Sequence, residues 1–354
     1  MTNTVTASTI FILSGENMKK FRIGIWDHCR YVTNRQAPYD EMARHLERMA
    51  KCGVTLTNIY LPEVISLDDY CRAAANCGME LEARITPAWA SEKVVNRTLP
   101  EPEWLRMEKD LGIRLSGPCG NREDNRELFL AAAETLAAEY GSRLNALHLD
   151  FIRNDNALTL LDFPCQCEVC KGLYKRFFGV DTLTPEMRQN PAVLYKLAAL
   201  RCKNIRKTAE AMKRIAEKHD LRLSIAARAN YVNSADITAP PVWGLGPAVL
   251  EGQDWVEWAD EGIIDELFPM NYHTEIGLFE SVLKDHKRLL GDKASRMLFP
   301  GVGVESSMGI NSPADVAERI AIVKNSSLPG VMLFNKTNIY SDDYCRIIKE
   351  YAEE

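Results

Sequence analysis

The stretch NALHLDFIRNDNALTLLDFPCQCEVC, residues 145–170, decides how we interpret the fold. It begins with a short apolar run, residues 146–152, that carries one acidic residue, Asp150, near its end. Apolar runs of this length, bounded by polar residues, are typical of buried β-strands. Asp150 and Arg153 then lie at the carboxyl end of the strand, ahead of three closely spaced cysteines. The segment predicts a catalytic strand, a metal-binding loop, or both.

Similar β-rich runs recur along the chain, and most are followed by a segment with helical periodicity. The eight predicted strands are residues 21–26, 56–61, 79–85, 146–152, 221–227, 265–270, 297–303 and 330–335. The predicted helices are residues 40–51, 67–77, 126–140, 192–219, 252–259, 276–290, 313–324 and 342–351. An open, doubly wound sheet is the alternative, but no glycine-rich G-x-G-x-x-G turn follows the first strand. The alternation therefore favours the α/β class, as a closed (β/α)8 TIM barrel.

The same pattern defines the domain organisation. The repeat fills the chain to its end, so we expect a single barrel domain over residues 18–354 and a disordered N-terminal extension over residues 1–17. The connections after strands 3 and 4, residues 86–125 and 153–190, are long and contain Trp, Pro, Gly and Cys. Long ordered connections in a compact domain are often functional, so we expect them to belong to the active site.

Composition limits the classes of partner. The formal net charge is −6 with no long basic run, which argues against nucleic acid as a partner, and no apolar stretch is long enough for a membrane span. The N-terminus lacks the pattern of a signal peptide, which predicts a cytoplasmic protein whose ten cysteines are reduced thiols rather than a disulfide framework. The sequence leaves the oligomeric state open.

Catalytic residues of barrel enzymes lie at the carboxyl ends of the strands, where this sequence places acids, amides and aromatic residues. Aromatic rings stack on sugar faces, while amides and guanidinium groups bind hydroxyls, so this mixture is typical of a carbohydrate pocket. We expect the tryptophans either to stack on substrate or to pack against the barrel. The candidate substrate-binding residues are Trp26, Asp27, Glu63, Arg84, Trp89, Arg153, Arg228, Asn230, Asn271, Tyr272, His273 and Asn335.

Two carboxylates are the candidate catalytic pair. Asp150 is a charge inside an apolar strand, and such a group must be paired or functional because burying it alone is costly. Its structural alternative is an ion pair with Arg153 or Arg84. Glu305, at the end of the seventh strand, is the candidate partner as acid or base. The alternatives for this second role are Glu63, Asp27 and Glu275.

Cys165, Cys167 and Cys170 form a Cys-x-Cys-x-x-Cys run beyond the fourth strand. Three thiols at this spacing could hold a structural zinc, but a closed zinc site normally takes four ligands. Cys119 is the best distant candidate for the fourth. The alternative is a set of buried thiols that anchors the loop and a helix at residues 168–178. We predict no catalytic metal and no cofactor.

Three segments, LHLDFIRND…CQCEVC, QDWVEWADEGIIDELFPMNYH and PGVMLFN, resemble uncharacterised bacterial glycoside-hydrolase-like barrel proteins. That family carries a D-[FY]-I-R segment on strand four, and a Cys-x-Cys-x-x-Cys run often follows it. The resemblance spans most of residues 21–340 and implies a TIM barrel of the glycoside hydrolase class. Asp150 and Arg153 match the motif, whereas Asn154 and Asp155 stand where many relatives have Tyr-Pro, so the shape of this loop is expected to differ.

The leading hypothesis is therefore a glycoside hydrolase that acts on a small or oligomeric glycoside through carboxylate catalysis. A metal-dependent sugar isomerase or aldolase-type barrel is one alternative, and it would draw its ligands from His28, Glu63, Asp150 and His273. A carbohydrate-binding barrel without catalysis is the other.

Overall fold

The computed structural model describes residues 20–27, 39–60, 67–87, 119–154, 167–184, 186–187, 190–231, 248–334 and 341–353. Eight parallel strands form one sheet in the order β6-β5-β4-β3-β2-β1-β10-β7. They are β1 (Arg22–Asp27), β2 (Leu56–Tyr60), β3 (Glu80–Ile85), β4 (Ala146–Leu149), β5 (Arg222–Ala227), β6 (Glu266–Pro269), β7 (Gly301–Gly303) and β10 (Gly330–Phe334). A parallel bridge between Leu267 of β6 and Leu298, which shortly precedes β7, brings the two outermost strands together, and the predicted (β/α)8 barrel is confirmed.

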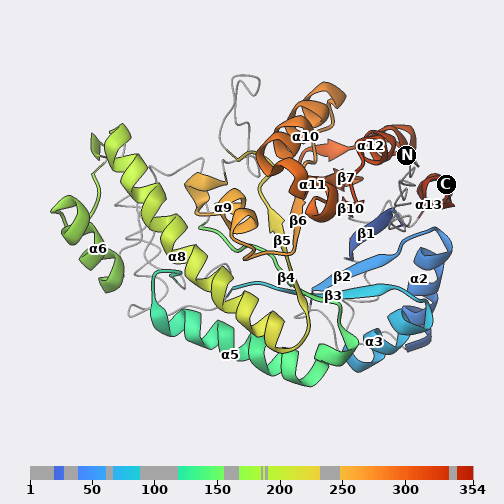
Figure 1. The fold of residues 1–354 in the computed structure, drawn as a ribbon, viewed down its shortest axis with the longest axis horizontal. Helices are drawn as coiled ribbons and strands as arrows, with labels where there is room; N and C mark the ends of the chain where they lie inside the picture. The colour runs from blue at the N-terminus through green and yellow to red at the C-terminus, as the bar shows by residue number, and fades with distance from the viewer. Residues whose placement is uncertain are drawn as a thin grey trace, which may run out of the picture.

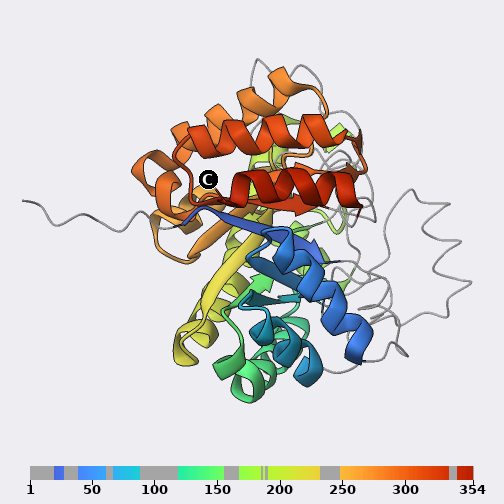
Figure 2. The ribbon, with the colours of Figure 1, turned by 90° about the vertical axis from the view of Figure 1, so that its right-hand side faces the viewer.

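Helices cover the outside of the barrel (Figures 1 and 2). The longer ones are α2 (Tyr39–Lys51), α3 (Leu67–Asn76), α5 (Glu123–Tyr140), α8 (Pro191–Lys218), α10 (Ile276–Leu290), α12 (Pro313–Asn325) and α13 (Asp342–Glu353). Figure 2 shows α12 and α13 side by side, next to β1. Helix α6 (Glu168–Phe178) lies at the edge of the molecule beside the first turns of α8 (Figure 1). Its bounds match the helix predicted after the cysteine run. Within the described part of the chain, no helix combines the length and apolar character needed to cross a membrane.

Successive side chains of a strand point to opposite faces of the sheet. In each barrel strand they therefore point in turn toward the surrounding helices and into the barrel. On β1, Ile23 and Ile25 belong to the large apolar core between the sheet and the helices. Trp26 points to the other face, into a smaller apolar cluster inside the barrel that includes Phe268 and Met332. This parity fixes which strand residues can contribute to a site at the barrel mouth.

Four charged residues close the amino-terminal end of the barrel. We call Arg22, Glu80, Arg222 and Glu266 the barrel floor. Arg22 lies 3.1 Å from Glu80 and 2.7 Å from Glu266, and Arg222 pairs with Glu80 and lies 3.5 Å from Glu266. Each charge therefore has two opposite neighbours, and the four charges sum to zero.

The chain departs from the prediction around the seventh strand. The predicted run 297–303 begins in a short helix, α11 (Ala294–Met297), and only Gly301–Gly303 forms a barrel strand. A two-stranded antiparallel hairpin, β8 (Glu305–Ser306) and β9 (Gly309–Ile310), follows it. Strands of two residues are too short to show a periodic pattern, so the sequence could not predict this hairpin.

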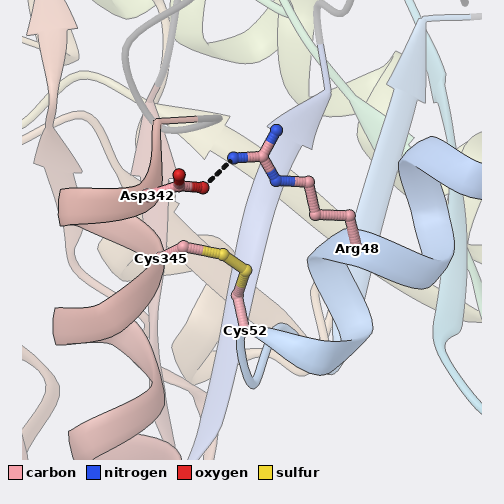
Figure 3. The surroundings of a disulfide bond; sticks show 4 residues. All are labelled: Arg48, Cys52, Asp342 and Cys345. Atoms are coloured by element: carbon pink, nitrogen blue, oxygen red, sulfur yellow. Dashed lines mark hydrogen bonds and ion pairs between the residues drawn. A yellow bond between two sulfur atoms is a disulfide. The ribbon is translucent and has the colours of Figure 1, made fainter.

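The expectation that all cysteines are reduced is wrong for one pair. Cys52, directly after α2, and Cys345, in the first turns of α13, form a disulfide with their Cα atoms 4.9 Å apart (Figure 3). Nearby, Arg48 donates a 2.6 Å hydrogen bond to Asp342. The two cysteines are 293 residues apart. Barrel closure brings the helices together because β1 pairs with β10, and no local sequence pattern records that contact.

Candidate active site

Asp150 directly follows β4 at the carboxyl end of the barrel, where the alternation of the strand points its side chain inward. Its backbone N–H still bonds to the carbonyl of Ile85 on β3 (3.0 Å), which extends the strand ladder by one residue. The carboxylate accepts a 2.8 Å hydrogen bond from the N–H of Phe151 and lies 3.8 Å from Nη1 of Arg84. The side chain of Asp150 is 14% exposed, so the carboxylate has an ion-pair partner and an open side.

Phe151 marks a strained turn directly after this carboxylate. Its φ is +53°, in the left-handed region that side chains other than glycine rarely adopt. Such a conformation costs of order 1–3 kcal/mol and is found mostly where function needs a particular backbone direction. The guanidinium of Arg153 lies 4.3 Å above the Phe151 ring and covers the turn. The strain therefore coincides with the candidate catalytic residue.

Tyr272 lies inside the barrel, packed against Trp26 and Phe334, and it feels the charge of Asp150. Its ring stacks on Phe334 at 4.8 Å and meets Trp26 edge-on at 6.0 Å. Burial and the negative charge of Asp150 raise the pKa of the Tyr272 phenol well above its usual value. The hydroxyl therefore remains protonated and can donate a hydrogen bond beside the carboxylate.

A buried ion-pair cluster flanks this site. Glu251, at the end of a short 3-10 helix (Val249–Glu251), accepts hydrogen bonds from Nε and Nη2 of Arg228, at 2.5 and 3.0 Å. Nε of Arg153 lies 3.5 Å from the same carboxylate, and the Glu251 carbonyl accepts from the N–H of Asn154 at 2.8 Å. Arg153 and Arg228 thus join the β4 and β5 ends, and the carboxylate that holds them was not predicted.

A second network that the sequence analysis missed lies one layer deeper in the barrel. Trp26 Nε1 donates to His148 Nε2 (3.3 Å), so His148 Nδ1 is the donor to Ser224 Oγ (2.8 Å), which donates to Glu82 (2.9 Å). The side-chain Nδ2 of Asn58 also donates a hydrogen bond to the Glu82 carboxyl group, at 2.8 Å. The visible signals were Glu82 in ELEARI and His148 in ALHL, charged or titratable residues at inward strand positions.

Burial keeps this inner network neutral. Burial, and to a lesser extent the charge of Glu266, raises the pKa of Glu82 to about 8. Burial and the positive charge of Arg84 lower the pKa of His148 well below its usual value. Both side chains are fully buried. They support Trp26 from beneath, without a surface for substrate.

Three of the remaining predicted residues make contacts that hold the fold together. Asp27 faces outward, where its carboxylate accepts from the Tyr70 hydroxyl (2.7 Å) and lies 3.1 Å from His45. Asn271 donates to the carbonyl of Phe279 at 3.0 Å, which anchors α10. The backbone carbonyl of His273 accepts from the Arg319 guanidinium. These positions point to structural contacts for the three residues.

Asn230 and Glu305 occupy the rim. Asn230 is buried, and its carbonyl accepts from the N–H of Ala248 at 2.7 Å. Glu305 lies on β8, partly exposed and beyond the end of β7. Its charge, after burial and Asp315, contributes to the raised pKa of Tyr344. Among the contacts described for the chain, none joins Glu305 to Asp150. The predicted residues Glu63, Trp89, Asn335, His28 and Cys165 lie outside the described residues.

The fold and the rim define the class of protein, a (β/α)8 barrel with an acidic residue at the end of β4. No protein-family model matches the chain, and no curated protein matches its sequence. The chain is similar in structure to the PgaB (BpsB) glycoside hydrolase domain of Bordetella bronchiseptica, with a TM-score of 0.61 and 11% identity over 95% of this chain and 99% of that one.

Two further solved structures share the fold. The endo-1,4-beta-D-mannanase of Thermotoga petrophila gives a TM-score of 0.55 at 13% identity over 94% of this chain and 99% of that one. The chitinase of Chromobacterium violaceum gives 0.54 at 9% identity, over 95% and 99% respectively. At these identities the likeness establishes the barrel fold, while function has to be argued from the site.

Proposed function

We propose that the protein is a glycoside hydrolase in which Asp150 acts as nucleophile or general base. The observation that carries the proposal is the position of Asp150. Asp150 lies at the carboxyl end of the barrel, directly after β4. Its carboxylate faces inward and still reaches solvent. Barrel enzymes place their chemistry at this end, and glycoside hydrolysis requires a carboxylate there. The names of the similar structures, a glycoside hydrolase domain, a mannanase and a chitinase, support the same class.

The residues around Asp150 suit its proposed role. The Phe151 N–H donates a hydrogen bond to the carboxylate, and the Arg84 guanidinium lies 3.8 Å from it, so both groups orient Asp150. The protonated Tyr272 hydroxyl would bind a sugar hydroxyl beside the reacting carbon, while Arg153 and Arg228, fixed by Glu251, would keep the loop ends in place. In this proposal Asp150 attacks the anomeric carbon, or takes a proton from the attacking water, on the face opposite the leaving oxygen.

Glu305 is our candidate for the acid that protonates the leaving oxygen. It is partly exposed on the hairpin that follows β7, three strands from β4 around the barrel. Two other described carboxylates suit this role less, because Glu251 is held by two arginines and Glu82 is fully buried. Small or oligomeric glycosides are the proposed substrates.

The test is Asp150→Asn, which preserves the shape and removes the charge. We expect turnover of a responsive aryl glycoside or oligosaccharide to fall by about two orders of magnitude or more, the usual scale for such a group. Asp181→Asn, at an exposed position, is the matched control. Circular dichroism and thermal unfolding verify that both variants fold. A folded Asp150→Asn protein with near-normal turnover would contradict the assignment.

A carbohydrate-binding barrel without turnover is the second candidate. The pairing of Asp150 with Arg84 favours it, because an ion pair alone would satisfy a buried carboxylate. In that case sugars would bind, as measured by calorimetry, while the wild-type protein hydrolyses none of the panel.

A further inference from the structure

Three cysteine sulfurs gather at the outer edge of the molecule, away from the barrel mouth. The sulfurs of Cys119, Cys167 and Cys170 all lie within 4.8 Å of one another, and we call them the thiol cluster. In the described part of the chain it is the one group of at least three His, Cys, Asp or Glu side chains close enough to share a metal ion. Cys165, two residues before Cys167 in sequence, lies outside the described residues.

The geometry of the thiol cluster suits a metal better than a disulfide. The Cys119 and Cys170 sulfurs are 3.4 Å apart, well beyond the bond length of about 2.05 Å in a disulfide. Thiolates bound tetrahedrally to zinc at about 2.3 Å would lie about 3.8 Å from one another. The observed separations therefore leave room for an ion between the sulfurs.

Hydrogen-bond donors surround the sulfurs. The backbone N–H of Asn121 donates to Cys119 (3.4 Å), and its side-chain Nδ2 donates to Cys170 (3.2 Å). The N–H of Cys170 donates to Cys167 at 3.4 Å. Asn121 is itself held by Asn204 of α8, which donates to its Oδ1 at 2.6 Å. Donors to sulfur favour the thiolate, which is the form that binds metals.

The position of the cluster on α6 adds to this preference. Cys167 is the N-cap of α6 and Cys170 lies in its first turn. The amino-terminal end of a helix stabilises negative charge, including that of a thiolate. The site thus favours thiolates through backbone N–H groups and a side-chain amide.

The surroundings explain what a metal would stabilise. Cys119 and Cys170 belong to a small apolar cluster with Tyr174, Leu183 and Leu197, separate from the barrel core. Such small units gain stability from a metal or a disulfide because their apolar contacts alone are few. Cys119 precedes α5 and ends the long connection from β3, while Cys167 begins α6 and ends the long connection from β4. One ion here would fix two rim connections to each other.

We infer that Cys119, Cys167 and Cys170 bind a structural Zn²⁺ ion that ties the start of α5 to the start of α6. Zinc is the divalent ion that buried thiolate sites most often hold, and it carries no redox chemistry. The ion would stabilise the two long connections and would take no part in the reaction proposed for Asp150.

The experiment measures zinc in the full-length protein, purified without chelator from zinc-supplemented medium and dialysed into metal-free buffer. Elemental analysis should give about one zinc per chain. Cys170→Ser should lose it, whereas Cys77→Ser, a half-buried thiol on the far side of the barrel, should retain it. A strong chelator should lower the Tm of wild-type protein by at least about 3 °C and leave Cys170→Ser unchanged.

A second measurement avoids dependence on the folding of the variant. In wild-type protein, the three thiols should react with an alkylating reagent only after chelation, as read by peptide mass spectrometry, and Co²⁺ should restore protection with thiolate charge-transfer absorption. Zinc well below one per chain with all three thiols freely alkylated would overturn the inference. A Cys119–Cys170 disulfide in the mass map would overturn it equally.

Discussion

The two ends of the barrel handle buried charge in different ways. At the barrel floor, two arginines and two glutamates alternate so that every charge has two opposite neighbours. At the mouth, Asp150 has one arginine at 3.8 Å, one backbone donor and an open side. The backbone is in a preferred conformation at the floor strands, while Phe151 beside Asp150 takes a strained one.

This difference separates stability from function within one fold. A closed ring of charges leaves no group for a ligand, so its value lies in holding the strand ends together. An incompletely neutralised carboxylate on a strained turn costs stability, and such a cost is usually retained where it serves a site. Residues of the same chemical types therefore have opposite expected effects at the two ends, and substitutions can test that separation.

The largest further effect is expected at the mouth. Glu305→Gln removes the proposed acid, so glycosides with poor leaving groups should lose about 100-fold in turnover, while activated aryl glycosides with acidic phenols should lose far less. Stability should stay near the wild-type value because Glu305 is partly exposed. The measurement is kcat/KM across a series of leaving groups, with the exposed Glu280→Gln as control. An equal loss for all leaving groups would remove Glu305 from the acid role.

A smaller effect of the opposite kind is expected at the floor. Glu266→Gln leaves Arg22 and Arg222 short of one counter-charge in a largely buried setting. Removing one partner of a fully buried pair costs about 3–5 kcal/mol, so about 2 kcal/mol is reasonable for this partly solvated ring. Urea unfolding measures it, and turnover per folded molecule should not change.

The control for the floor is an exposed pair of the same type. The side chain of Asp342, which pairs with Arg48, is 99% exposed. Asp342→Asn breaks this contact and should leave the free energy of unfolding unchanged. A floor variant as stable as this control would show that the ring of charges does not hold the barrel end together.

The sequence predicted the barrel because its evidence is repetitive. Strand β4 illustrates this, since ALHL is fully buried and mostly apolar, and Asp150 breaks the run where the strand ends. The approximate bounds of most helices followed from the periodicity of their apolar residues. In α10, Ile276–Leu290, the predicted bounds agree with the structure.

What the sequence could not predict depends on side-chain direction and on distant contacts. Asp27 follows Trp26 at a strand end and was a candidate for that reason, but strand parity turns it toward Tyr70 and His45. Glu251 and the Cys52–Cys345 disulfide arise from residues that only the closed barrel brings together. By contrast, the cysteine run was visible as a motif, and Cys119, its distant candidate partner in the sequence, does lie with Cys167 and Cys170.

The last expected effect lies between floor and mouth, at Glu82, and it takes the form of a pH dependence. Burial raises the pKa of Glu82 from 4.5 to about 8 in the folded protein. Between these values the folded protein holds a proton that the unfolded chain has released. The free energy of unfolding contributed by Glu82 is therefore complete below about pH 4.5 and is lost as the pH rises through about 8.

Glu82→Gln keeps an uncharged group of similar shape that can still accept from Asn58 and Ser224, as Glu82 does at 2.8 and 2.9 Å. We expect the stability of the wild type relative to this variant to decline with rising pH, by at most about 1.4 kcal/mol per pH unit. Urea unfolding at pH 5, 6.5 and 8 (about one and a half units apart) resolves such a slope. The exposed Glu280→Gln should run parallel to the wild type. If the stability of Glu82→Gln also followed that of the wild type at every pH, Glu82 would be ionised in the folded protein. The barrel interior would then balance charge with charge, as the floor does, and would not be a neutral network between the floor and the mouth.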